Sequence, residues 1–504
     1  MNAGSPTPPR PQPASRQDTL VFFLRGHNKE NIGDRHPALA DDKRVRRIAP
    51  VLDSIPRLLI NQAGRHVYAI GIVRPSFDNP KALILVSGNV QQVPEDVVVH
   101  LESLLNALHA ARLRVREKDC VSFPPSFLEI PTYIPENTDD PLLKQILAME
   151  VAVYRHSWIK VKRRSEKYGW SKAFLDVCAA VLSPSPPQLI SREALTVLEE
   201  LRGPEGDRDS ILREFRTASG ALVAILDVLR GECDDARIHW LRLALDALDI
   251  SVDSLRQLLP GVLLNCRSYI RLVDEKYQYQ GPDIARWMQK LLSTRQDFAQ
   301  VMSFIGSPTL DDVLGAGFEI KVVTPAPVPP VLWEVSMDSL KSALGERYYN
   351  VAGMEESAME KFVDRLANKI GHAVTKKDGI HCECAILVEL DKISHTRPVI
   401  PYVGVSKLSC AFCHAYFTAY RQSKGSDIMT RGTHGQIVPW RSPTLAHDPQ
   451  LDEMVRASMS SQLATSLGAA VMEGRGGSSQ PLHVPHRKTN PVIRWSSPLF
   501  LRQW

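Results

Sequence analysis

Two short runs of β-branched and aliphatic residues have the pattern of paired strands. They cover 67–73 and 82–86, and the segment between them, 74–80, is rich in Pro, Asn and Asp. Such a segment is typical of a turn, so the pattern predicts a β-hairpin with a long loop. Upstream, apolar residues recur at helical intervals over 45–60, but Pro50 and Pro56 interrupt them. Because proline removes a helical hydrogen bond, two short helices are expected there.

From 95 to 323 the pattern is almost wholly helical. The strongest helix, 236–259, has apolar residues at alternating spacings of three and four, and Pro260 closes it. Such a seam suits packing inside a helical bundle or a helix-mediated homo-oligomer. A strand-like run at 318–323 leads into a Pro-rich linker over 324–353, and an amphipathic helix over 354–370 follows.

The two ends of the chain lack this patterning. Residues 1–18 are rich in Pro, Ser and Gln, which predicts a disordered tail. The composition of 471–504 predicts a flexible basic tail. The N-terminal segment lacks the apolar core of a secretory signal, and no apolar run approaches the roughly 18 residues that span a bilayer. We therefore expect no membrane partner and an intracellular location, cytoplasmic or nuclear.

Composition adds one further clue, which comes from cysteine. The net charge of +5 is small for 504 residues and by itself indicates no polyanionic partner. Four of the 8 cysteines lie close together, namely Cys382, Cys384, Cys410 and Cys413. In a reducing compartment such a cluster more readily binds a metal than forms disulfides.

Two motifs place metal-binding residue types at the starts of two predicted helices. His381 and Glu383 form His-x-Glu, Cys410 and Cys413 form Cys-x-x-Cys, and a predicted strand at 399–405 lies between them. A helix N-terminus favours the thiolate that binds metal. One imidazole and two thiolates leave the fourth position of a tetrahedral zinc ion to a water, whose pKa zinc lowers to about 7. Glu383 could then carry protons to and from that water.

These motifs resemble the zinc-dependent cytidine-deaminase superfamily, whose signature is H-x-E followed by P-C-x-x-C. The segments 403–410 and 430–435 resemble a fungal deaminase-like family predicted to act on nucleic acids. The resemblance implies that His381, Cys410 and Cys413 hold Zn²⁺ and that Glu383 is the catalytic acid and base. Ser409 stands where the signature has proline, which leaves the ligands in place but puts the shape of the substrate pocket in doubt.

The resemblance also implies an α/β fold, a cytidine-deaminase-like three-layer α-β-α zinc domain, here with a large mainly helical region. The zinc core is expected over 354–443. Its hairpin should precede the catalytic helix, yet the clear hairpin lies within 19–94, far upstream. Either that hairpin begins the deaminase sheet and 95–323 is an insertion, or 19–130 is an independent α/β domain.

The implied function is hydrolytic deamination, in which zinc-bound hydroxide attacks a cyclic amidine carbon and Glu383 shuttles the proton. The substrate would be a nucleobase, nucleoside or single-stranded nucleic acid. A different class stays open, because His381, Cys384, Cys410 and Cys413 could form a closed Cys₃His structural site in a catalytically silent protein whose helical region binds another protein.

A basic and aromatic run over 158–170 could bind phosphates and bases, act as a nuclear import signal, or be a solvated helix face. The basic C-terminal tail has the same alternatives.

Overall fold

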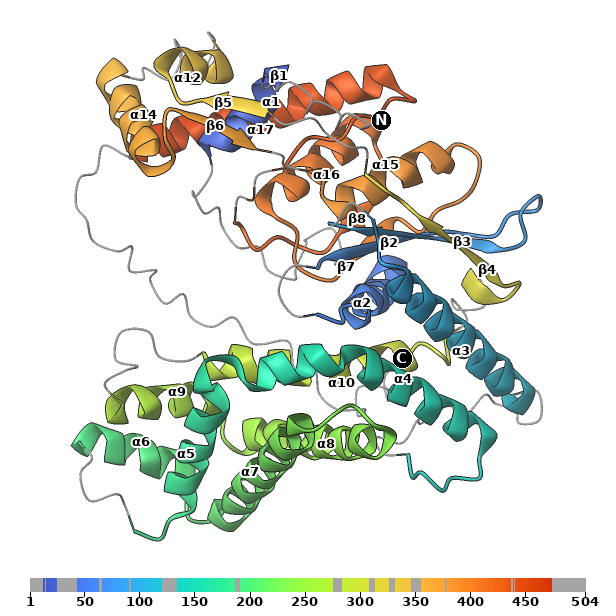
Figure 1. The fold of residues 1–504 in the computed structure, drawn as a ribbon, viewed down its shortest axis with the longest axis vertical. Coiled ribbons are helices and arrows are strands. Elements are labelled where there is room, and N and C mark those ends of the chain that lie inside the picture. Colours follow the sequence, from blue (N-terminus) through green and yellow to red (C-terminus); the bar gives the residue numbers. More distant parts are fainter. Residues whose placement is uncertain are drawn as a thin grey trace, which may run out of the picture.

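A five-stranded mixed sheet, assembled from four distant segments of the chain, lies at the centre of the protein (Figure 1). The computed structural model describes residues 12–13, 15–24, 43–62, 66–89, 92–119, 134–185, 191–274, 283–307, 313–325, 331–345, 355–376, 379–436, 438 and 440–473. The strand order is β4-β3-β2-β7-β8. The strands are β2 (Tyr68–Val73), β3 (Ala82–Gly88), β4 (Phe318–Val322), β7 (Tyr402–Val405) and β8 (Met429–Thr430).

The expected hairpin is β2 and β3, and it lies in the same sheet as the strand between the two motifs. β2 pairs antiparallel with β3 on one side and with β7 on the other, with Ile70 opposite Gly404. β4 pairs parallel with β3, and β8 pairs parallel with β7. The chain therefore leaves the sheet after β3 and returns beside β3 as β4. The helices between these two strands in the sequence are an insertion between neighbouring strands of one sheet. The hairpin is not part of a separate α/β domain over 19–130.

Both faces of the central strands β2, β3 and β7 are buried, because apolar side chains occupy both sides of these strands and pack against helices. Ile70 and Ile72 of β2 face α2 (Lys43–Leu58) and α3 (Glu95–Asp119). Ala69 and Val73 face the opposite layer, which contains α15 (Cys382–Ser394) and α16 (Ala411–Lys424). This alternation is the period of two expected of a strand.

The helix α2 is continuous, which corrects the expectation of two short helices over 45–60. Pro50 and Pro56 both lie inside it. The Ser54 hydroxyl donates to the Pro50 carbonyl, and a stripe of apolar side chains, among them Val51, Leu52 and Ile55, is buried against the sheet. Burial of this stripe outweighs the hydrogen bonds that the two prolines remove.

The inserted helices α4 to α10, here called the helical lobe, pack below the sheet in Figure 1. The predicted helix at 236–259 is α8 (Asp235–Leu258), and its apolar seam packs inside the lobe along α7. The ends of α4 and α10 nearest the sheet share a core with α2 and α3. The bounds are α4 (Pro141–Ser165), η2 (Lys167–Gly169), α5 (Trp170–Leu182), α6 (Arg192–Arg202), α7 (Arg208–Arg230), α9 (Val262–Val273) and α10 (Ile284–Met302).

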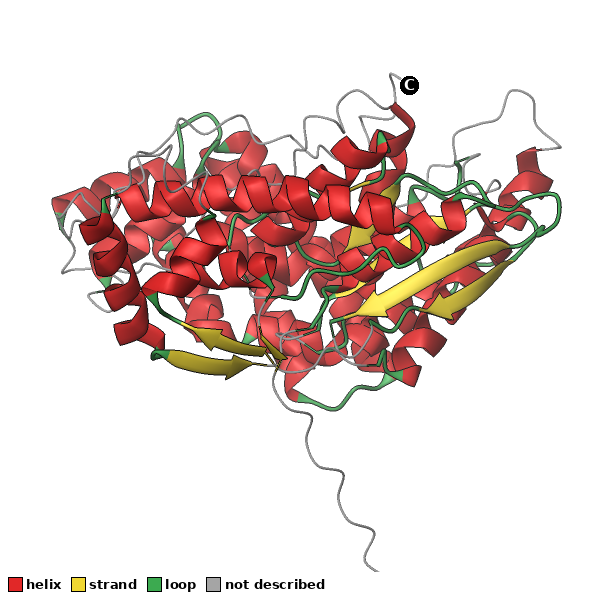
Figure 2. Ribbon diagram, turned by 90° about the horizontal axis from the view of Figure 1, so that it is seen from above, coloured by secondary structure: helices red, strands yellow, loops and turns green. Residues whose placement is uncertain are grey.

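A second, three-stranded sheet and four helices complete the upper part, and Figure 2 shows its strands apart from the main sheet. The strand order is β1-β5-β6, and β5 and β6 are antiparallel. These elements are β1 (Gln12–Pro13), α1 (Arg16–Phe23), β5 (Val331–Glu334), α12 (Met337–Leu344), α14 (Glu356–Ile370), β6 (Ala373–Lys376) and α17 (Pro449–Glu473).

Three expected boundaries differ from this arrangement. The tail predicted over 1–18 contains β1 and the buried start of α1, where Gln17 donates to the Arg456 carbonyl of α17. The linker predicted over 324–353 contains β5 and α12, whose apolar residues join the core around α15. The tail predicted from 471 begins within α17, where Val471 is buried, and 474–504 lie outside the described residues. Within the described part of the chain no helix has the length and apolar character needed to cross a membrane.

Candidate metal and catalytic centre

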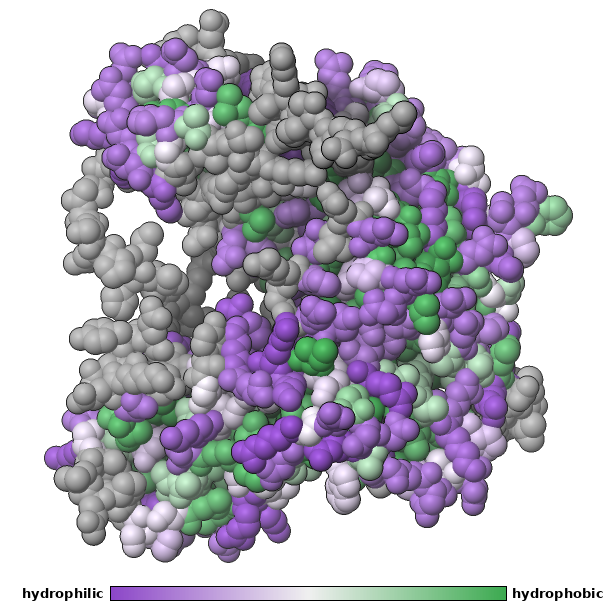
Figure 3. All heavy atoms as spheres, viewed as in Figure 1, coloured by the Kyte–Doolittle hydropathy of each residue, from purple (hydrophilic) through white to green (hydrophobic). Residues whose placement is uncertain are grey.

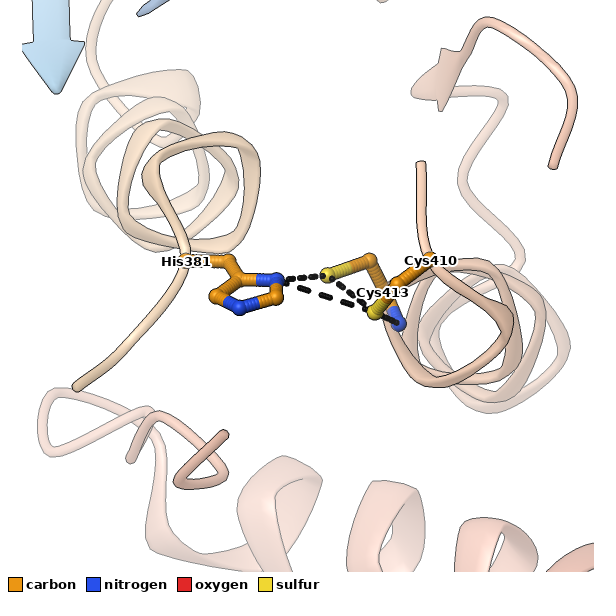
Figure 4. Close-up of side chains that lie close together, drawn as sticks. All are labelled: His381, Cys410 and Cys413. Atoms are coloured by element: carbon orange, nitrogen blue, oxygen red, sulfur yellow. Dashed lines mark hydrogen bonds between the residues drawn. The ribbon is translucent and has the colours of Figure 1, made fainter. Parts of the chain in front are cut away.

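His381, Cys410 and Cys413 converge at the facing N-termini of α15 and α16 (Figure 4). His381 is the N-cap residue of α15, and Cys410 is the N-cap residue of α16. The His381 Nδ1 lies 3.2 Å from the Cys413 Sγ and 3.6 Å from the Cys410 Sγ, and the two sulfurs are 3.4 Å apart. The structure thus brings together the three residues that the motifs select.

The donor set and its spacing fit zinc. Zinc-to-sulfur bonds of about 2.3 Å and zinc-to-nitrogen bonds of about 2.0 Å place tetrahedral ligand atoms roughly 3.5 Å apart. The observed separations of 3.2 to 3.6 Å come close to this without rearrangement of either helix. If these three side chains hold zinc, a fourth position stays open, as in catalytic rather than structural zinc sites.

The surroundings of Cys410 favour its thiolate. Burial raises the pKa of this thiol, but hydrogen bonds with Cys413 and His381 outweigh burial and lower the pKa to about 5. The Cys413 backbone N–H also donates to the Cys410 sulfur, 3.4 Å away, as an N-cap bond. Burial, followed by the neighbouring Cys384 and Cys410, raises the pKa of Cys413, so a cation is needed for both thiols to ionise.

Glu383 lies in the first turn of α15, two residues beyond His381, and its side chain is buried. The Cys382 thiol donates to the Glu383 Oε2 across 3.4 Å. Burial and then the charge of Glu383 raise the pKa of Cys382, so this thiol stays protonated as a donor. The contact joins two residues that are adjacent in the sequence, Cys382 and Glu383.

Cys384 lies beside the three convergent residues but is not one of them. Within the described residues, the ligand atoms that lie within 4.8 Å of one another here belong to His381, Cys410 and Cys413. Cys384 is fully buried and hydrogen-bonds with Cys413, and burial raises its pKa to about 11. Its environment is that of a neutral core thiol in contact with Cys413.

Trp440 and the loop 432–436 hold the centre from outside the two motif helices. The Trp440 ring stacks on the His381 imidazole, with centroids 6.0 Å apart. The loop is hydrogen-bonded to Ser409, whose carbonyl accepts from the His434 N–H and the Thr433 hydroxyl. His434 thus belongs to a loop fastened to the residue before Cys410. Sequence reasoning missed Trp440, because nothing in its local pattern separates it from a core aromatic.

A second group with metal-binding side chains lies at the other end of α15, where Asp391, His395 and His447 meet. Its carboxylate is already satisfied: the Asp391 oxygens accept from the Tyr420 hydroxyl at 2.5 Å, from Lys424 and from His447 at 2.6 Å. Asp391 therefore ties α15 to α16 and to the segment before α17.

The basic run at 158–170 is divided between the interior and the surface. Lys160 is buried and donates to the Arg57 carbonyl at 2.9 Å, and burial followed by Arg164 lowers its pKa to about 7. Arg163 and Lys167 are exposed, and Arg164 is half-buried. Lys160 thus belongs to the packing between α4 and α2, whereas Trp170, at the end of the run, packs against the core of the helical lobe.

Comparison with known proteins bears on the motif segment. The model of an OTT_1508-like deaminase family matches residues 380–444, which include both motifs and the loop that follows them. Residues 380–444 are similar to a deaminase family. No curated protein and no solved structure matches the chain. The expected resemblance to a deaminase is confirmed for this segment, and the other described residues form a mixed α/β frame with a large helical lobe.

Proposed function

We propose that the chain is a zinc-dependent hydrolytic deaminase of the fungal deaminase-like kind, acting on a nucleobase in a nucleoside or in nucleic acid. The observation that carries this proposal is the convergence of His381, Cys410 and Cys413. Glu383 is buried in the first turn of α15, two residues after His381. The match of 380–444 to a deaminase family supports the same reaction class.

His381, Cys410 and Cys413 would hold the metal, and zinc when bound supplies a Lewis acid that activates water near neutral pH. Glu383 is the group on this chain that accepts and returns protons. It takes a proton from the attacking water and delivers it to the amidine, and the carbon–nitrogen bond then breaks to release ammonia. The Cys382 thiol, 3.4 Å from the Glu383 Oε2, holds this carboxylate in place as it changes protonation state.

Ammonia release from nucleosides and from single-stranded DNA and RNA tests the proposal, with Glu383→Gln as the decisive variant. Loss of the proton carrier should lower turnover by about 100-fold or more while zinc stays bound. Glu389→Gln is the matched control, because Glu389 lies on the same helix and its carboxylate bonds Lys321 at 2.6 Å, on the outside of α15. Equal turnover in the two variants would contradict the role of Glu383.

The contact between Cys384 and Cys413 favours one second candidate, a catalytically silent protein with a Cys₃His zinc site. In that case Cys384 would be a metal ligand, Glu383 would have no role, and the helical lobe would serve a protein partner. Zinc content of Cys384→Ala separates the two candidates before any substrate is known.

The requirement for reduced thiols supports an intracellular site of action, cytoplasmic or nuclear. Assay of zinc content in protein recovered from each compartment of a producing cell tests this part of the proposal.

A further inference from the structure

The loop 432–436 runs alongside the segment that leads into α16. Thr433 pairs with Ser409 in a parallel bridge, and the Ser409 carbonyl accepts from the His434 N–H at 3.2 Å. In a parallel pairing the next residues of the two segments lie opposite each other, so His434 lies opposite Cys410. Cys410 is one of the three convergent side chains of the candidate centre. The pairing therefore brings His434 beside the metal-binding residues.

A second attachment holds the far end of this loop on α16. The Ala411 N–H, at the first residue of the helix, donates to the Gln436 carbonyl at 3.0 Å. Gly435 has a φ of 71°, in the left-handed region that favours glycine, and its N–H donates to the Thr433 hydroxyl at 3.0 Å. His434 thus lies in a tight turn that is fixed at both ends. A side chain held in this way loses little conformational entropy when it binds a ligand.

A hydrogen bond inside the turn fixes which nitrogen of the His434 ring carries the proton. The Gln436 N–H donates to the His434 Nδ1 at 3.1 Å, so Nδ1 is an acceptor and the neutral ring carries its proton on Nε2. The residue is half-buried, and the ring has no other hydrogen-bond partner within the described residues. The Nε2–H is therefore a donor that lacks an acceptor on this part of the chain.

The segment that follows the loop reaches the opposite side of the centre. The Arg441 N–H donates to the Gly379 carbonyl at 3.2 Å, and Trp440 stacks on the His381 imidazole. The Trp440 indole N–H is buried and has no hydrogen-bond partner among the residues that the structure describes. Buried donors of this kind are normally paired with protein, water or a ligand. His434 and Trp440 thus each bring an unpaired N–H donor to the centre.

Donors without acceptors are complementary to the kind of ring that a deaminase binds. A cyclic amidine carries an acceptor, the ring nitrogen beside the amino-bearing carbon, and many such bases also carry a carbonyl oxygen. Hydrophilic side chains predominate on the face of the molecule seen in Figure 3, with apolar side chains interspersed among them. A small polar ligand that meets such a surface is selected by individual hydrogen bonds rather than by a broad apolar contact.

We propose that His434 is a substrate-binding residue whose Nε2–H donates to an acceptor atom of the base, a ring nitrogen or a carbonyl oxygen. This inference rests on the proposed function and adds a residue that lies outside both motifs. The neutral imidazole orients the base relative to Glu383 and takes no part in proton transfer. Its hydrogen bond is made in the bound substrate as well as in the transition state, so its loss raises KM more than it lowers kcat.

Two neutral substitutions separate the roles of the two ring nitrogens. In His434→Asn the amide oxygen can replace Nδ1 as the acceptor for the Gln436 N–H, but the amide N–H₂ does not reach as far as Nε2. In His434→Gln the amide N–H₂ reaches the position of Nε2, but the turn loses its acceptor. We expect His434→Asn to raise Kd and KM by about 3- to 10-fold, because one neutral hydrogen bond is lost. We expect His434→Gln to bind almost as tightly as the parent and to unfold at a lower temperature.

Equilibrium titration of the zinc-loaded full chain measures Kd, with Glu383→Gln as the background so that no substrate is consumed. The probes are cytidine, adenosine and short single strands of RNA and DNA. Ammonia release by the chain with Glu383 intact measures KM and kcat for the same substitutions. His109→Asn is the matched control, because it makes the same change at a half-buried histidine on α3. Zinc content and thermal unfolding verify that each variant folds.

Weaker binding by His434→Asn, with His434→Gln close to the parent, supports the inference. Loss of affinity in His434→Gln alone would assign His434 to holding the turn. That result overturns the inference, as do equal losses in the two variants, unchanged affinity in both, or no binding of any probe by the parent. Failure of the proposed function is recognised separately, because a chain that binds a probe but releases no ammonia from it still yields the Kd comparison.

Discussion

Trp440 stacks on His381 with ring centroids 6.0 Å apart and planes inclined by 27°. Tyr416 meets the same indole edge-on, at 5.9 Å and 90°. The indole therefore fixes the plane of the imidazole, and with it the direction in which Nδ1 faces the two sulfurs.

Replacing Trp440 with alanine should loosen the metal site without removing a ligand. We expect zinc affinity to fall by about 10- to 100-fold, as for other residues that orient a ligand, while Trp440→Phe retains most of it. Competition with a chelator of known affinity measures the change. Trp333→Ala is the control, because Trp333 is buried in the same core cluster but stacks on Phe22. Equal losses in the two alanine variants would indicate only general destabilisation.

The convergent ligands predict a stoichiometry of about one zinc per chain. Alanine substitution of His381, Cys410 or Cys413 should each abolish it, because each removes one of three protein ligands. Cys384→Ala should keep the metal and cost only a small cavity in the core. Elemental analysis together with thermal unfolding decides the outcome. Loss of zinc from Cys384→Ala would instead identify the closed Cys₃His site.

His100 predicts sensitivity of folding to mild acid. Burial, then His156 and Lys160, lowers its pKa to about 3, and its ring stacks on His156 at 3.9 Å. Between pH 6.5 and pH 3 the unfolded chain therefore binds a proton that the folded chain does not, so stability falls as pH falls. From pH 7 to pH 5 the loss from His100 is about 2 kcal/mol.

Denaturant unfolding at pH 7 and pH 5 measures this loss. His100→Phe should reduce the difference between the two pH values, because it keeps a ring against His156 but cannot bind the proton. His109→Phe, at a half-buried position on the same helix, should leave the difference unchanged. If His100→Phe kept the full wild-type difference in stability between pH 7 and pH 5, groups other than His100 would cause that difference.

Two glycines allow helices to approach the sheet closely from opposite sides. A methyl group at Gly404 would overlap the backbone carbonyl of Leu52 in α2, whereas one at Gly71 would lie 2.6 Å from the Ile386 side chain of α15. Because a backbone cannot move aside as a side chain can, Gly404→Ala should destabilise the fold more than Gly71→Ala. We expect about 3 kcal/mol or more against about 1 to 2 kcal/mol. Thermal unfolding of the two variants compares them, and the reverse order would contradict the close approach of α2 to β7.

The sequence was most informative where local pattern and chemistry coincide. The hairpin and His381, Cys410 and Cys413 could be located from alternation and spacing, because a strand period and a ligand set are local properties. The continuity of α2 through Pro50 could not, because burial against a sheet completed by distant residues outweighs the local effect of proline. Trp440 was missed for a similar reason, since only the folded chain brings it onto His381.

The order in which the strands of the main sheet are translated affects how long the nascent chain is prone to aggregate. β2 emerges from the ribosome more than 300 residues before β7, the strand that covers its open side. At a translation rate of about 5 to 20 residues per second, that edge of β2 stays unpaired for roughly 15 to 60 s before β7 is synthesised. The helical lobe, built from short-range contacts, can fold during that interval, whereas the apolar hairpin stays exposed to aggregation. Slow or interrupted translation after residue 88 should therefore reduce the yield of folded protein more than interruption after 430, when every strand of the main sheet has been made.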